Sequence, residues 1–140
     1  MVTKKEADKL RDKIKDAART IYTELGGGYL ETVYEEAMAV ELRERKIKYE
    51  VERNKEVFYK NVKVGEHRLD FIVENYLVVE LKAGTGITSS HVGQTYAYLK
   101  ANDLEYGLIC NFPYPDSHDD KKLFKDINKA DLDKGLENIE

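Results

Sequence analysis

The sequence is poor in cysteine, histidine and proline, and it has no long hydrophobic run. Its one cysteine, Cys110, excludes an internal disulfide, and its apolar neighbours predict a buried structural thiol. No segment approaches the ~18 apolar residues that a membrane-spanning helix needs. The charged, periodic N-terminal segment is unlike a secretory signal. We therefore expect an intracellular protein, cytoplasmic or nuclear, that does not contact a membrane.

Two further kinds of site find no support in the sequence. The three histidines, His67, His91 and His118, show no metal-ligand spacing. The glycines 26–28 follow no strand and precede no P-loop lysine, so we do not expect a nucleotide cradle there. Any site must therefore be built mainly from carboxylates, lysines and aromatic residues.

Charged residues are abundant and unevenly placed. They make up 36% of the 140 residues, beside 41% hydrophobic residues, which predicts a single globular domain over residues 1–140. The net charge is −4, yet residues 43–68 contain nine Lys or Arg against five Asp or Glu. Residues 116–140 are acidic, with five Lys against eight Asp or Glu. The basic stretch is either a source of phosphate contacts or a solvated strand face, and the sequence leaves both open.

Helical periodicity dominates the first third of the chain. Thr3-x-x-Glu6 has the pattern of a capping box, and apolar residues follow at helical spacing until the glycines 26–28 end the helix. A second helix is expected over about residues 30–46. The residues expected on its inner side are Val33, Tyr34, Ala37, Met38 and Leu42.

Strand patterns follow from about residue 47. We expect a hairpin around Lys60-Asn61, then a central pair of strands at about 67–73 and 76–82, joined at Glu74-Asn75. A third helix, capped by Ser89 or Ser90, leads to an apolar strand over 105–112, and this connection favours a parallel neighbour with a right-handed crossover. A short strand or turn and a marginal helix are expected in the tail. The fold class is α/β (α+β), a mixed sheet flanked by helices.

The central pair of strands carries an unusual set of charges. Asp70 lies in the first strand, and Glu80 and Lys82 lie two apart in the second, so the latter two share a face. Charge in an apolar strand is usually paired or metal-bound. One interpretation is a structural ion-pair cluster. The other is a site for Mg²⁺ or Mn²⁺ held by the two carboxylates, a backbone carbonyl such as that of Leu81, and water.

Spacing alone does not decide between these interpretations. The same E-x-K pattern recurs at Glu44 and Lys46, where we expect surface residues at a helix end. Two further motifs distinguish the strand cluster. Residues 28–34, GYLETVY, fit G-x-x-E-x-x-Y, and residues 91–99, HVGQTYAYL, contain Q-x-x-x-Y. With RLDFIV and VVELKA between them, the set resembles the GxxExxY family of the PD-(D/E)XK nuclease superfamily over roughly residues 10–112.

The resemblance implies a restriction-endonuclease-like core with a divalent metal site. By position, Asp70 and Glu80 would bind the metal, and Lys82 would act on the nucleophile or the transition state. Glu31 would reach the metal directly or through water, and Gln94 would support Lys82 or a phosphate. One departure is Leu69, which replaces the proline of the superfamily's motif.

Three aromatic or imidazole side chains are candidate substrate contacts. Tyr98, Tyr34 and His91 lie within or beside these motifs. The two tyrosines fit a hydrophobic core equally well. His91 fits a surface position at a helix start, and Glu31 fits a favourable charge in the first turn of its helix. These alternatives stay open at the level of sequence.

The resemblance predicts a metal-dependent nuclease that hydrolyses nucleic acid, above all DNA, in repair, recombination or defence. The alternative is a noncatalytic nucleic-acid-binding or assembly module on the same fold. A hydrolase of small phosphoesters is a third, less favoured hypothesis. A homodimer is conceivable by analogy with junction-cutting members of the superfamily. Residues 113–140 form an acidic extension outside the expected core.

Overall fold

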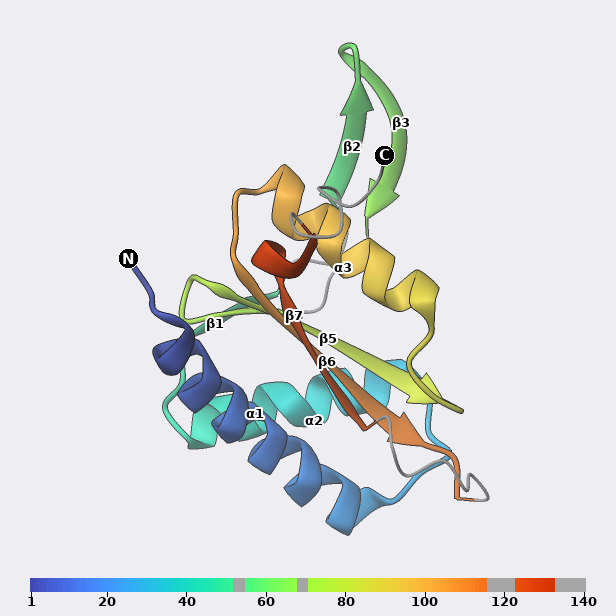
Figure 1. Cartoon of the computed structure of the whole chain (residues 1–140). Helices are drawn as coiled ribbons and strands as arrows, with labels where there is room; N and C mark the ends of the chain where they lie inside the picture. The colour runs from blue at the N-terminus through green and yellow to red at the C-terminus, as the bar shows by residue number, and fades with distance from the viewer. Residues whose placement is uncertain (52–54, 68–70, 116–122, 133–140) are drawn as a thin grey trace.

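The fold is known from a computed structural model, which describes residues 1–51, 55–67, 71–115 and 123–132 (Figure 1). Three helices and seven strands can be given both ends in this part of the chain, and residues 129–132 after the last strand are helical as well. The helices are α1 (Lys4–Leu25), α2 (Glu31–Glu44) and α3 (Ser89–Ala101). The strands are β1 (Tyr49–Val51), β2 (Lys55–Tyr59), β3 (Val62–His67), β4 (Phe71–Val73), β5 (Leu77–Gly84), β6 (Tyr106–Pro113) and β7 (Phe124–Asn128).

Five of the strands form one mixed sheet in the order β1-β4-β5-β6-β7. Strands β5 and β6 are parallel, as their connection through α3 requires, and the other neighbours are antiparallel. The expected mixed sheet and parallel neighbour are therefore confirmed. Strand β7, which the expected core of residues 10–112 left out, pairs with β6 and buries Ile127 completely.

The sheet has helices on both faces (Figure 1). On one face α1 and α2 pack on a cluster that includes Leu77, Val79 and Leu81 of β5. On the other face α3 packs on a second cluster that includes Val78 of β5 and Ile109 of β6. Because strand side chains alternate, Glu80 and Lys82 belong to the α3 face, as the sequence predicted.

Helix α1 begins and ends as expected. The Thr3 hydroxyl accepts a hydrogen bond from the Glu6 backbone N–H at 3.2 Å. At the other end Gly26 has a φ of +68°, which glycine adopts without steric cost, and its N–H donates to the Tyr22 carbonyl. The next residue, Gly27, lies against the Pro113 carbonyl, so this corner holds α1 against the end of β6.

Two helix expectations need correction. Val33 was expected on the inner side of α2, but its side chain is exposed. The buried stripe runs through Tyr34, Met38 and Leu42 at four-residue spacing, and Val33 lies about 100° away from Tyr34 around the helix. Helix α3 is capped by Thr88, whereas Ser89 or Ser90 was expected.

Strands β2 and β3 form a separate two-stranded sheet that projects from the body beyond α3 (Figure 1). The hairpin turns at Lys60 and Asn61, as expected, with φ values of +48° and +66°. The Glu74-Asn75 turn between β4 and β5 is confirmed as well. Cys110 is buried, as predicted. Among the described residues no helix has the length and apolarity to cross a membrane.

Candidate active site

Glu80 is a buried carboxylate at the centre of the sheet. Its side chain is 1% exposed, and its neighbours along β5 are apolar. Oε2 accepts a hydrogen bond from the hydroxyl of Thr95 on α3, at 3.0 Å. Thr95 is itself fully buried, and its hydroxyl also lies 3.1 Å from the His91 carbonyl. One carboxylate oxygen is thus held by the helix that covers this face of the sheet.

The first turn of α3 is locked by a reciprocal cap. The Thr88 hydroxyl accepts from the His91 backbone N–H, and Nδ1 of the His91 ring accepts from the Thr88 backbone N–H, both at 3.1 Å. Since Nδ1 is an acceptor, the neutral His91 ring carries its proton on Nε2. His91 therefore has a structural role at the helix start through Nδ1, and its Nε2–H is a hydrogen-bond donor that the cap does not use.

The electrostatic surroundings of His91 connect it to the charged pair on β5. Partial burial lowers the pKa of His91, and the nearby Lys82 cation lowers it further, while the Glu80 carboxylate acts in the opposite direction. The ring is thus near enough to both side chains to respond to their charges. The structure brings together Glu80, Lys82 and His91, with Thr95 between strand and helix.

Lys82 lies on the same strand and face as Glu80 and is partly buried. It makes no hydrogen bond or ion pair with another described residue. Its in-register neighbour on β6 is Asn111, which is 6% exposed and donates from Nδ2 to the Gly84 carbonyl at 3.2 Å. An amide therefore ties the end of the strand that carries Lys82 to β6.

The other predicted residues belong to α2 and α3, which pack on opposite faces of the sheet. Glu31 is the partly buried first residue of α2, and this segment approaches the carboxyl ends of β5 and β6, because Tyr34 stacks on Phe112 with ring centroids 4.2 Å apart. Gln94 is exposed on the outer side of α3. Tyr34 is fully buried, and its hydroxyl donates to the Gly26 carbonyl at 2.7 Å. Tyr98 is 3% exposed in the core cluster beneath α3.

These positions distinguish the two tyrosines as core residues or candidate substrate contacts. Tyr34 is held on both sides by the protein, with Phe112 against its ring and Gly26 on its hydroxyl, so the structure gives it a core role. Tyr98 packs in the core and also lines a groove beside β2. Asp70 lies outside the described residues.

The donor set has the chemistry of a magnesium site but is incomplete in this part of the chain. Glu80 offers a buried carboxylate, and carboxylate oxygens are the ligands that hard divalent cations prefer. No group of three or more His, Cys, Asp or Glu that could hold a metal occurs among the described residues. Asp70, the other carboxylate that the sequence predicted for this site, directly precedes β4 in the sequence and lies outside the described residues.

Sequence reasoning missed Thr95 and Asn111. Thr95 is a polar residue on the buried face of α3, beside Tyr98 and Leu99. A hydroxyl on an otherwise apolar helix face was the available signal. Asn111 is a polar residue inside the apolar strand β6, and its alignment with Lys82 depends on a register that spacing does not supply.

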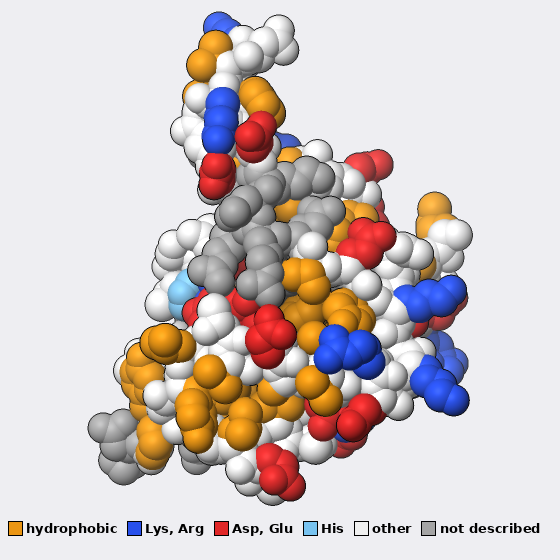
Figure 2. Space-filling view, turned by 180° about the vertical axis from the view of Figure 1, so that it is seen from behind, with side chains coloured by type: hydrophobic (Ala, Val, Ile, Leu, Met, Phe, Trp, Pro, Cys, Tyr) orange, Lys and Arg blue, Asp and Glu red, His pale blue; other side chains and the backbone are white. Residues whose placement is uncertain are grey.

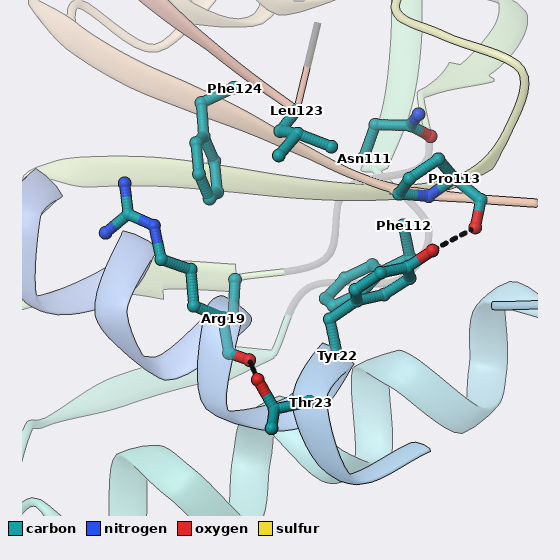
Figure 3. A pocket seen from close by; sticks show the side chains of 9 residues that line it. Arg19, Tyr22, Thr23, Asn111, Phe112, Pro113, Leu123 and Phe124 are labelled. Carbon is teal, nitrogen blue, oxygen red and sulfur yellow. Dashed lines mark hydrogen bonds between the residues drawn. The ribbon is translucent and has the colours of Figure 1, made fainter. Parts of the chain in front are cut away.

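A separate cavity of about 250 Å³ lies on the opposite side of β6 (Figure 3). Tyr22, Phe112 and Phe124 are among the residues that line it, and the Tyr22 hydroxyl donates to the Pro113 carbonyl at 3.0 Å. Arg19 lies over the Phe124 ring, 5.1 Å from its centroid. This cavity contains no carboxylate, and the chemistry described above lies elsewhere.

Comparison with known proteins agrees with this geometry at the level of the superfamily. A solved structure, "Crystal structure of SSO0001", is similar, with a TM-score of 0.49 and 20% sequence identity. The similarity covers 76% of this chain but only 56% of that one, so this chain spans little more than half its length. No curated protein matches. A sequence model of the PD-(D/E)XK nuclease superfamily matches residues 8–123, which include the whole charged strand and both flanking helices. The fold is restriction-endonuclease-like, and the chain belongs to the PD-(D/E)XK nuclease superfamily.

Proposed function

We propose that the protein is a divalent-metal-dependent nuclease of the GxxExxY family that hydrolyses phosphodiester bonds in DNA. The observation that carries the proposal is Glu80, a buried carboxylate held by Thr95 and followed two residues later by Lys82 on the same face. An E-x-K pair without a functional role would be expected on the surface, as Glu44 and Lys46 are. This pair lies beneath a covering helix in a chain of a nuclease superfamily.

The proposed roles follow from position and chemistry. Glu80 and Asp70 hold Mg²⁺ or Mn²⁺, with the Leu81 carbonyl and Glu31 as further oxygen donors. When bound, such a cation lowers the pKa of a coordinated water and neutralises charge on a phosphoryl group. Lys82 makes no hydrogen bond or ion pair with a described residue, and we assign to it the orientation of the attacking water or the stabilisation of the transition state. The role of Asp70 in this scheme depends on the sequence alone.

His91 and Gln94 are the proposed contacts to the substrate. The Nδ1 atom of His91 is occupied by the Thr88 N–H, so Nε2–H is available to donate to a phosphate oxygen. Gln94 lies one turn before Tyr98 on α3 and is exposed. Both residues belong to the helix that covers Glu80, which gives the site a polar rim on the α3 side.

The test is a cleavage assay with labelled DNA and RNA in Mg²⁺ or Mn²⁺. We expect cleavage that Glu80→Gln, Asp70→Asn and Lys82→Met each reduce by at least a hundredfold. The chain supplies a matched control, because Glu44 and Lys46 repeat the E-x-K spacing at exposed positions at the end of α2. Glu44→Gln and Lys46→Met should leave activity unchanged.

Calorimetry with Mn²⁺ separates this proposal from the noncatalytic alternative. The nuclease should bind Mn²⁺ and lose that binding in Glu80→Gln. DNA affinity without any metal binding or cleavage would refute the nuclease and favour a binding module. Activity that survives Lys82→Met and Glu80→Gln would refute the assigned mechanism.

A further inference from the structure

A groove of about 260 Å³ runs between the projecting hairpin and helix α3. Val57 and Phe58 of β2 form one wall, and Ala97, Tyr98 and Ala101 of α3 lie on the other. The groove is mainly apolar and contains two aromatic rings. It lies on the same helix as Thr95 but at the opposite end from the His91 cap, so it is distinct from the metal site proposed above.

The hairpin exposes more apolar surface than its own fold requires. Val57, Phe58, Tyr59, Val62 and Val64 are each between 43% and 63% exposed. Figure 2 shows hydrophobic side chains on the projecting hairpin, interspersed with charged ones. A two-stranded hairpin is only marginally stable alone, and contiguous exposed apolar residues usually mark a binding surface. The exposed apolar residues of the hairpin therefore indicate a binding surface.

The groove lies on the same helix that contacts Glu80 in the candidate active site. Tyr98 lies three residues after Thr95, or about 4.5 Å along the helix axis. Gln94, Ala97 and Ala101 recur at helical spacing on the exposed side of α3, which links the site to the groove. Since Thr95 contacts Glu80, a strand whose scissile phosphate lies at Glu80 would carry a neighbouring nucleotide to this groove.

The chemistry of the groove selects a nucleobase as occupant. Aromatic and aliphatic walls stack well on the face of any base. The volume of the groove is that of a small ligand, which is too small to admit a duplex. The Glu56 carboxylate at the groove has Lys63 at 3.6 Å, so its charge is offset. Lys60 lies at the hairpin turn, 5.4 Å from the Tyr59 ring centroid, and adds positive charge beside the aromatic residues.

We propose that this groove binds an unpaired base of the DNA substrate, so that the nuclease prefers DNA with a single-stranded segment beside the scissile phosphate. The inference rests on the proposed nuclease function and adds its substrate class. Phe58 stacks on the base, and Ala97, Tyr98 and Ala101 of α3 form the opposite wall. Blunt duplex DNA offers no unpaired base and gains nothing from the groove.

The hairpin supplies a matched pair of variants for the test. Phe58 lines the groove, whereas the next residue, Tyr59, is outside it and similarly exposed, at 63% against 57%. Affinity is measured by fluorescence anisotropy with EDTA present, on a forked oligonucleotide and a blunt duplex of the same sequence. We expect Phe58→Ala to bind the fork roughly 5- to 150-fold more weakly, the range of losing one base stack. Tyr59→Ala and Phe58→Trp should stay within about twofold of the wild type on the fork.

Each other outcome overturns the inference in a recognisable way. Equal losses for Phe58→Ala and Tyr59→Ala, or equal losses on fork and blunt duplex, would show that the groove does not read an unpaired base. Sedimentation that finds a dimer dissociated by Phe58→Ala would assign the groove to a second copy. If Glu80→Gln abolishes cleavage while Phe58→Ala binds forks normally, the nuclease stands and the groove proposal falls. A wild-type protein that neither binds nor cuts DNA would refute both.

Discussion

The hydroxyl of Thr95 donates a hydrogen bond to Oε2 of Glu80 at 3.0 Å, across the interface between α3 and the sheet. Both side chains are almost completely excluded from solvent. A buried carboxylate is costly unless it is hydrogen-bonded, so the contact stabilises the fold and fixes the carboxylate orientation together. Thr95 thus acts on the proposed metal through Glu80, as a positioning residue.

Thr95→Val should weaken metal binding and destabilise the fold by comparable free energies. Valine keeps the shape of threonine but removes the donor, which costs about 1–3 kcal/mol of unfolding free energy. Loss of a hydrogen bond to a metal-binding carboxylate typically weakens metal affinity about 10- to 100-fold. Mn²⁺ calorimetry and urea unfolding measure the two effects. Thr95→Ser keeps the hydroxyl and should restore affinity; equal affinity for Val and Ser would show that Thr95 only fills space.

His91 should titrate below its ordinary pKa of 6.5, because partial burial and Lys82 disfavour its charged form. The bond from the Thr88 N–H also needs an unprotonated Nδ1. NMR titration of the ring tests this. Lys82→Met should raise the pKa of His91, and Glu80→Gln should lower it further, since these neighbours act with opposite sign. Shifts of the same sign in both variants would contradict the arrangement.

The same shift has a consequence for stability. Below pH 6.5 the unfolded chain takes up a proton at His91 before the folded ring does, so this residue lowers the stability of the fold as the pH falls toward its folded-state pKa. His91→Gln should remove that part of the pH dependence. Urea unfolding at pH 7.5 and pH 5.5 should therefore show a smaller acid loss in the variant, and an unchanged loss would contradict the prediction.

Local patterns predicted much of this fold because they have local causes. The Lys60-Asn61 and Glu74-Asn75 turns, the shared face of Glu80 and Lys82, and the parallel pairing of β5 and β6 follow from turn chemistry, strand alternation and connection length. The superfamily followed from several such motifs in order, although no single one was specific.

Contacts between residues distant in the sequence could not be predicted from local patterns. Thr88, Ser89 and Ser90 are all good caps, and only the reciprocal bond with His91 selects Thr88. Thr95 and Asn111 gain their roles from packing against β5. The weak periodicity of the tail predicted a short strand or turn, but not that this strand pairs with β6 and that Ile127 closes the core. Arg11, on a helix rich in exposed charges, gave no sign of being buried.

Arg11 should be among the largest single contributors to stability. Its guanidinium is 1% exposed and donates to the carbonyls of Gly107 and Ile127 and to the Asn128 side chain, which joins α1 to β6 and β7. Arg11→Met removes the donor of these contacts, two of which are buried, and should cost about 2–4 kcal/mol.

An exposed arginine provides the control for Arg11. Arg43 lies on the surface of α2 and bonds to the Tyr49 hydroxyl at 2.8 Å. Arg43→Met should change the unfolding free energy by less than about 1 kcal/mol. Equal effects of the two variants in urea unfolding would contradict the role of Arg11 as a buried clip.

The corner between α1 and α2 gives the sharpest steric prediction. A side chain on Gly27 would overlap the Pro113 carbonyl oxygen, and its Cβ would lie 3.2 Å from Pro115 Cδ, so the end of β6 must shift. Gly27→Ala should therefore destabilise the fold by about 1–3 kcal/mol. Gly93, inside α3, has open space around its Cα, and Gly93→Ala should instead stabilise the fold by about 0.5–1 kcal/mol through helix propensity. Because the two substitutions are chemically identical, changes of the same sign in urea unfolding would contradict the packing of this corner against β6.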